Sequence, residues 1–193
     1  ADAVSGRSFM NPTEEILHNP FLMKDMDRAV KRISEAISMG EKITVYGDYD
    51  VDGVTSVCTL FLYLKSKGAL VNFYIPNRSG DGYGVSTAAI DSLKEQGTRL
   101  IITVDTGITA NEEVEYARNI GIDFVITDHH ECRADLPNAV AVINPHRPDC
   151  EYPYKELSGC GVGFKLITAL SMSLNRDINE VYELLDLVAV SIA

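Results

Sequence analysis

The chain has 193 residues, of which 46% are hydrophobic and 23% charged, and its formal net charge is −11. This composition is typical of one globular domain, and the acidic balance argues against a protein that coats nucleic acid with a broad basic face. No apolar run approaches the roughly 20 residues that cross a bilayer, and no signal pattern opens the chain, so we expect a cytoplasmic protein without a membrane partner.

The first predicted elements are a helix and a strand. Apolar residues recur at three- and four-residue steps over 26–37, which predicts an amphipathic helix that stops near Gly40. The β-branched and aromatic segment 43–46 predicts a buried strand. An acidic motif follows this strand directly.

Helices and strands then alternate along the rest of the chain. In chain order we expect a helix over 55–67, a strand over 70–75, a glycine-rich loop over 77–84, a helix over 86–96, a strand over 100–104, a helix over 111–120 with Asn111 as its N-cap, and strands over 124–127 and 139–143. This spacing predicts an α/β fold: a doubly wound, mainly parallel five-stranded sheet with helices on both faces.

Three motifs fall at strand ends, where such sheets bind ligands. The first carries Asp48, Asp50 and Asp52, the second is Asp105-Thr-Gly, and the third is Asp128-His129-His130. Aspartates crowded into one cleft raise one another's pKa unless cations neutralise them, which favours divalent metal. All-oxygen ligation suits Mg²⁺ or Mn²⁺, and imidazole moves the preference towards Mn²⁺. Asp105 is the best candidate to bridge two ions.

Other features carry weaker interpretations. Arg78 lies in the glycine-rich loop and could present its guanidinium to phosphate. Lys165 and His146 are weaker candidates for a functional role. A helix that begins at 159–163 could offer backbone N–H groups to an anion. The four cysteines lack a CxxC pair, which favours reduced thiols over a disulfide framework or a zinc site.

Each motif also has a plainer interpretation. The first resembles the start of a calcium loop, but Thr59 stands where an acidic residue is expected and a strand precedes it. Asp105 alone could be a turn residue that caps the next helix. A phosphorylation receiver domain also has acidic strand ends, but it gives the His129-His130 pair no role.

Taken together, the three ordered motifs resemble the DHH phosphoesterase superfamily and, within it, the RecJ-like single-strand-specific DNA exonucleases. This resemblance implies that Asp50, Asp52, Asp105 and His129 ligate two Mn²⁺ or Mg²⁺ ions, with Asp105 shared. It implies that Asp48 and Asp128 ligate or orient, and that Asp48, Asp105 and His130 act in catalysis. His130, with Arg78, would face the substrate phosphate. Tyr46, where pyrophosphatases of the superfamily have histidine, favours the RecJ-like branch.

The implied activity is metal-dependent hydrolysis of single-stranded DNA from its 5′ end, in repair and recombination, with a helicase and a single-strand-binding protein as possible partners. Two alternatives remain: a DHH phosphodiesterase acting on short oligonucleotides or cyclic dinucleotides, and a non-catalytic RecJ-like scaffold. We expect residues 1–193 to form a DHH catalytic domain truncated at its C-terminus. The family's second, DHH-associated domain and its OB-fold would then lie outside this sequence.

Overall fold

The computed structural model describes residues 17–77 and 84–193. Its centre is a sheet of five parallel strands in the order β2-β1-β3-β4-β5. The strands are β1 (Lys42–Tyr46), β2 (Val71–Tyr74), β3 (Thr98–Val104), β4 (Asp123–Thr127) and β5 (Ala141–Ile143). The predicted α/β architecture is therefore confirmed, and every strand pair in the described sheet is parallel.

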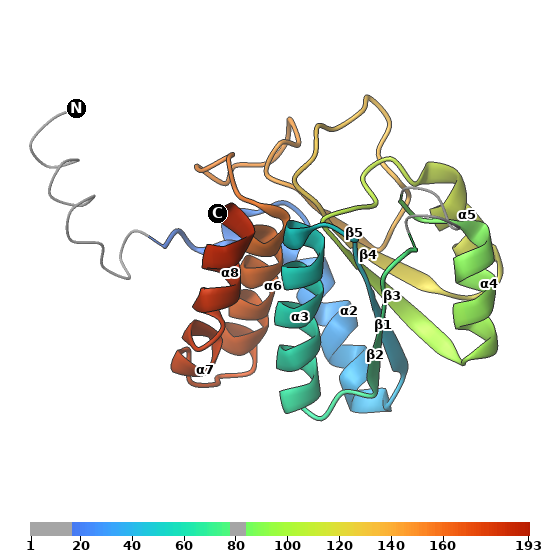
Figure 1. Cartoon of the computed structure of the whole chain (residues 1–193), viewed down its shortest axis with the longest axis horizontal. Helices are drawn as coiled ribbons and strands as arrows, with labels where there is room; N and C mark the ends of the chain where they lie inside the picture. Colours follow the sequence, from blue (N-terminus) through green and yellow to red (C-terminus); the bar gives the residue numbers. More distant parts are fainter. Residues whose placement is uncertain (1–16, 78–83) are drawn as a thin grey trace, which may run out of the picture.

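Helices cover both faces of the sheet (Figure 1). The helical elements are η2 (Pro20–Leu22), α2 (Met26–Met39), α3 (Val51–Ser66), α4 (Thr87–Glu95), α5 (Asn111–Asn119), α6 (Gly159–Ser173), α7 (Asn179–Tyr182) and α8 (Leu185–Ile192). Helices α2, α3 and α6 pack on one face, α4 and α5 pack on the other, and α8 lies against α3 and α6. None of the described helices has the length and apolar character needed to span a bilayer.

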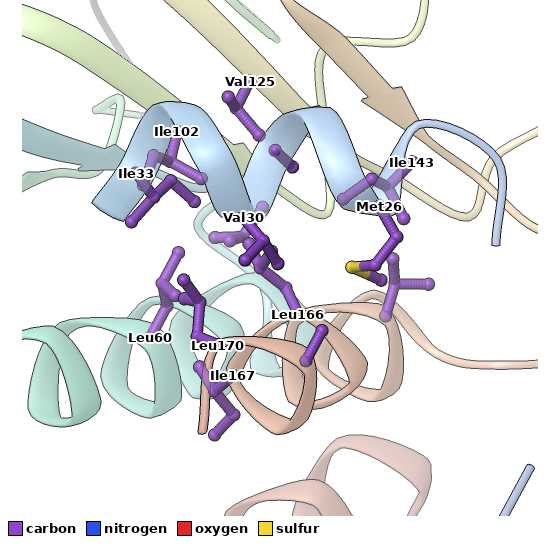
Figure 2. Close-up of a cluster of buried hydrophobic side chains, with 14 of the residues drawn as sticks. Met26, Val30, Ile33, Leu60, Ile102, Val125, Ile143, Leu166, Ile167 and Leu170 are labelled. Atoms are coloured by element: carbon purple, nitrogen blue, oxygen red, sulfur yellow. The ribbon is translucent and has the colours of Figure 1, made fainter. Parts of the chain in front are cut away.

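Two buried clusters hold the layers together, because each face of the sheet is apolar. Figure 2 shows the larger cluster, in which Met26, Val30 and Ile33 of α2 meet Leu166 and Leu170 of α6. The smaller cluster lies under α4 and α5. This burial is the main source of stability, at about 25 cal/mol for each Å² of apolar surface removed from water.

Two predicted helix starts differ from the structure. Helix α3 begins at Val51, four residues before the predicted start, because the Asp50 side chain caps it by accepting the Gly53 N–H. The prediction that Asn111 caps α5 is wrong: Ala110 is the N-cap residue, and the amide of Asn111 donates instead to the Asp135 carbonyl. The end of α2 at a left-handed Gly40 is confirmed.

Candidate metal centre

The first acidic motif connects β1 to α3 at the carboxyl edge of the sheet. Asp48 is buried, and its Oδ1 accepts the Tyr49 N–H at 2.7 Å. Asp50 is exposed, and its Oδ1 accepts the Gly53 N–H at 2.8 Å. One oxygen of each carboxylate is thus held by the backbone, which fixes the direction of the other.

Asp52 lies in the first turn of α3 and faces the N-terminus of α6. Its Oδ2 accepts the Gly159 N–H at 2.7 Å, and its Oδ1 accepts the Cys160 N–H at 2.8 Å. The sequence predicted that these N–H groups could approach an anion, and the anion that they bind is the carboxylate of Asp52. This contact fixes α3 and α6 side by side at the candidate site.

Asp105 follows β3 at the carboxyl edge of the sheet, called the rim below, and is buried, with 2% of its surface exposed. Its backbone is left-handed, with φ at 58°, a conformation that aspartate tolerates better than most residues. The alternative that it caps α5 is wrong, because α5 begins at Asn111. Among the described residues, its Oδ1 is a buried acceptor without a hydrogen-bond partner. Such an atom needs a cation or a donor.

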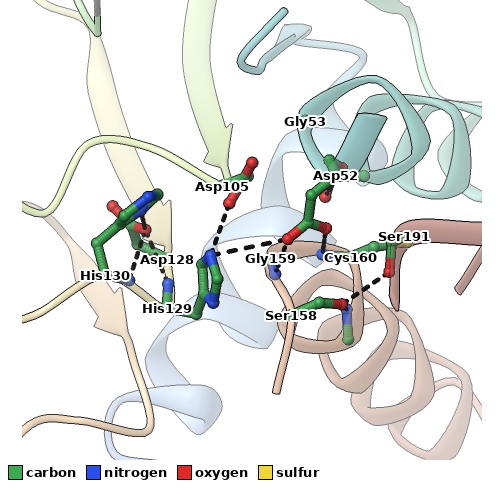
Figure 3. Close-up of polar contacts among 12 residues, drawn as sticks. Asp52, Gly53, Asp105, Asp128, His129, His130, Ser158, Gly159, Cys160 and Ser191 are labelled. Atoms are coloured by element: carbon green, nitrogen blue, oxygen red, sulfur yellow. Dashed lines mark hydrogen bonds and ion pairs between the residues drawn. The ribbon is translucent and has the colours of Figure 1, made fainter. Parts of the chain in front are cut away.

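His129 stands between two of these carboxylates, as Figure 3 shows. Its Nε2 lies 3.1 Å from Asp105 Oδ1 and 3.7 Å from Asp52 Oδ2. The shorter contact is an ion pair when His129 is protonated, and among the described residues Asp105 Oδ1 accepts no hydrogen bond. Two carboxylate oxygens and one imidazole nitrogen, donor types that Mn²⁺ accepts, thus lie close together.

Asp128 is buried and organises the histidine pair. Its Oδ1 accepts the N–H groups of His129 and His130 at 2.7 and 3.1 Å and lies 2.7 Å from His130 Nδ1, while its Oδ2 accepts the Ile108 N–H at 2.9 Å. Both oxygens of Asp128 are engaged, and Oδ1 has three partners where each Asp52 oxygen has one backbone donor, so Asp128 is suited to orient rather than to ligate. Because Nδ1 of His130 faces Asp128, its Nε2 is the nitrogen that can meet a substrate.

Among the described residues, two groups of side chains have donor atoms within 4.8 Å of one another, and both contain Asp105. The first group is Asp48, Asp50 and Asp105, and the second is Asp105, His129 and His130. Asp52 falls outside both groups but contacts His129. An arrangement with one shared carboxylate is what a pair of bridged divalent ions requires, and the orphaned Oδ1 of Asp105 fits that use.

The electrostatics of the rim reflect its crowding. Burial raises the pKa of Asp105 to about 6, with Asp52 and Asp50 adding to the rise and His129 opposing it. Contact with Asp105 raises the pKa of His129. The contact with Asp128 raises the pKa of His130 to about 9, and burial opposes that rise. For Asp128, burial favours a higher pKa, but the contact with the His130 ring and the N–H groups of Ile108 and His130 outweigh burial and lower it.

The other residues that the sequence analysis singled out do not belong to the two groups of potential ligands. Arg78 lies outside the described residues. His146 Nδ1 lies 3.2 Å from Glu131 Oε1, and His146 lines a pocket that also touches His129. Lys165 is buried along α6 and faces the His18 carbonyl, so it is not among the residues of the rim. The four cysteines are free.

Three supporting contacts were not predicted. A Cβ on Gly159 would lie 2.4 Å from Asp105 Oδ1, so only glycine admits that carboxylate. Buried Asn144, at the end of β5, donates to the His130 carbonyl at 2.9 Å. Tyr46 donates its hydroxyl to the Gly84 carbonyl at 3.0 Å. A polar residue that directly follows a buried strand was the available signal for Asn144.

The parallel α/β sheet and the carboxylates and histidines at its carboxyl edge are features of one protein family. A family model described as the DHH family, N-terminal domain, matches residues 42–192. The chain belongs to the DHH family, and its third motif supplies the Asp128-His129-His130 sequence.

Within the family the chain is similar to RecJ exonucleases. It is 48% identical over 188 residues to the single-stranded-DNA-specific exonuclease RecJ of Bacillus subtilis, covering 97% of this chain and 23% of that protein. It is 40% identical over 178 residues to the RecJ of Escherichia coli, covering 87% and 31%. The chain therefore spans about a quarter to a third of the length of these relatives.

Solved structures agree with this relationship. A crystal structure of exonuclease RecJ bound to manganese matches with a TM-score of 0.79 and 34% identity, over 88% of this chain and 42% of that one. RecJ from Thermus thermophilus in complex with Mn²⁺ matches with a TM-score of 0.74 and 30% identity, over 88% and 24%.

Proposed function

We propose that this chain is the catalytic domain of a metal-dependent phosphodiesterase that degrades single-stranded DNA from its 5′ end. The observation that carries the proposal is Asp105. It is a buried carboxylate with an unsatisfied oxygen, and it is common to two groups of potential ligands. The similarity to RecJ exonucleases supports the choice of substrate, and two solved RecJ structures are bound to manganese.

The proposed ligands form two sets, one for each ion. Asp48, Asp50 and Asp105 would hold one ion, and Asp105, His129 and Asp52 would hold the other. When bound, two such ions would lower the pKa of a water molecule and neutralise charge on the phosphoryl oxygens.

The rest of the rim acts on the substrate. The contact with Asp128 raises the pKa of His130 to about 9, which favours the protonated imidazole. His130 can therefore stabilise negative charge on the phosphate or the leaving oxygen.

Metal binding is the first test. Titration of the chain with Mn²⁺, followed by calorimetry, should detect ions at the rim, and Asp105→Asn should abolish the binding of both because that carboxylate is shared. Asp50→Asn should remove one site. Exposed Asp27 in α2 provides the control, and Asp27→Asn should bind as the parent chain does. Unchanged Mn²⁺ binding in Asp105→Asn would overturn the proposed centre.

Hydrolysis is the second test, run on the chain by itself and within any longer polypeptide that contains it. The substrates are 5′-phosphorylated single-stranded DNA, the matching duplex, dinucleotides and cyclic dinucleotides. We expect mononucleotides from the 5′ end of single strands and about a thousandfold loss of kcat in Asp105→Asn. Preference for dinucleotides would favour the phosphodiesterase alternative. Metal binding without hydrolysis of any substrate would favour the scaffold alternative.

Helicase and single-strand-binding-protein partners stay predictions, as do the cytoplasmic location and the domain boundary.

A further inference from the structure

A pocket of about 430 Å³ lies between η2, α6 and α7, apart from the residues of the metal centre. Its cationic side chains are Lys165 of α6 and Arg176, which follows that helix, and its walls include the aromatic rings of Phe164 and Tyr182. The described lining residues include no aspartate or glutamate. In a chain of net charge −11, this is a locally basic surface.

Lys165 is an unusual lysine. Only 4% of its surface is exposed, and its Nζ donates to the His18 carbonyl at a long 3.3 Å and lies 5.7 Å from the centre of the Tyr152 ring. Burial lowers the pKa of Lys165 to about 8, and no described carboxylate opposes that shift. An ammonium has three donors, so two remain for a ligand.

Among the described residues, the two arginines with the most enclosed side chains have carboxylate contacts that Lys165 lacks. Arg32 bonds to Asp123 and Glu41, with N to O distances of 2.7 and 2.6 Å. Arg147 likewise bonds to two aspartates and a backbone carbonyl. Each of these guanidinium groups has carboxylate partners, as a buried charge requires. Lys165 has only a carbonyl and an aromatic face in the described part of the chain.

We propose that this pocket binds a phosphate group, free or as part of a mononucleotide, through Lys165 and Arg176. Two cations match the charge of a phosphate better than that of a carboxylate. A pocket of this volume admits a nucleoside as well, and the rings of Phe164 and Tyr182 suit a base. The inference stands apart from the proposed hydrolysis, because no residue of the metal centre lines the pocket.

Calorimetry in EDTA at constant ionic strength tests the proposal, because chelation removes divalent ions from the rim. The probes are inorganic phosphate, thymidine 5′-monophosphate and thymidine. We expect one phosphate or monophosphate per chain and no binding of thymidine. Tighter binding of the monophosphate than of phosphate identifies a nucleotide site, and equal binding identifies a phosphate site.

Variants locate the binding. Lys165→Met and Arg176→Gln should each weaken phosphate binding by about tenfold or more, as expected for loss of a charge-assisted hydrogen bond. Lys155 also donates to a backbone carbonyl but lies outside the pocket, so Lys155→Met is the matched control. Asp105→Asn should bind phosphate normally even if it fails to bind Mn²⁺.

Circular dichroism and thermal melting confirm that Lys165→Met is folded, and exposed Arg176 gives a second variant that does not touch the core. Absence of saturable phosphate binding by the parent chain would overturn the proposal. So would phosphate binding that survives in both Lys165→Met and Arg176→Gln.

Discussion

Replacement of Gly159 by alanine tests how the shared carboxylate is held. A Cβ at this position would lie 2.4 Å from Asp105 Oδ1 and 2.5 Å from Asp105 Cβ, about 1 Å closer than ordinary contact allows. Asp105 is buried, so it can move only by disturbing its neighbours. Overpacking of this kind costs about 1–3 kcal/mol of unfolding free energy. Displacement of a shared ligand should also weaken Mn²⁺ binding by about 10- to 100-fold.

Gly163 supplies the matched control for this change. It lies in the same helix α6 and is buried, but a Cβ there meets no atom within 4 Å. Gly163→Ala should therefore raise stability by about 0.5–1 kcal/mol through helix propensity and leave Mn²⁺ binding unchanged. Urea denaturation followed by circular dichroism gives the stabilities, and calorimetry gives the affinities. If Gly159→Ala matches Gly163→Ala in both measurements, the argument that Gly159 makes room for Asp105 is refuted.

Three further predictions concern charge. The folded-state pKa of Lys165, about 8, lies below its ordinary 10.5, so between these pH values the unfolded chain binds more protons than the folded chain. The free energy of unfolding should therefore rise with pH in this range by about 3 kcal/mol relative to Lys165→Met. Parallel pH profiles of the two proteins in phosphate-free urea melts would contradict this. Mn²⁺ affinity should begin to fall as pH drops through the pKa of His129, which is raised above 6.5, and should fall about tenfold or more per unit below pH 6, where Asp105 with its pKa of about 6 is protonated as well. A flat calorimetric profile would exclude Asp105 as a ligand. Asp128→Asn should lower the free energy of unfolding by about 2–3 kcal/mol and return the pKa of His130 from about 9 toward 6.5. An NMR titration of this variant that still gives a pKa of about 9 would show that Asp128 does not cause the shift.

The candidate site shows where sequence reasoning worked and where it failed. The side chains that line the rim were predictable, because each motif directly follows a strand whose alternation with helices was visible in the residue pattern. The start of α3 at Val51 was not predicted, since helical periodicity gives no weight to an aspartate that caps. The prediction that the α6 N-terminus could bind an anion did not identify that anion as Asp52, 107 positions before Gly159.

The sequence by itself determined the fold class, the family and the residue types of a metal centre, because strand and helix periods and motif order are local properties of the chain. Only the tertiary structure decided the strand order β2-β1-β3-β4-β5 and showed which donor atoms lie within 4.8 Å of the Asp105 carboxylate. It alone showed that Gly159 packs against Asp105 and that Lys165 lacks a described carboxylate partner. These features depend on contacts between segments far apart in sequence, and packing and burial fix such contacts without leaving a periodic signal in the chain.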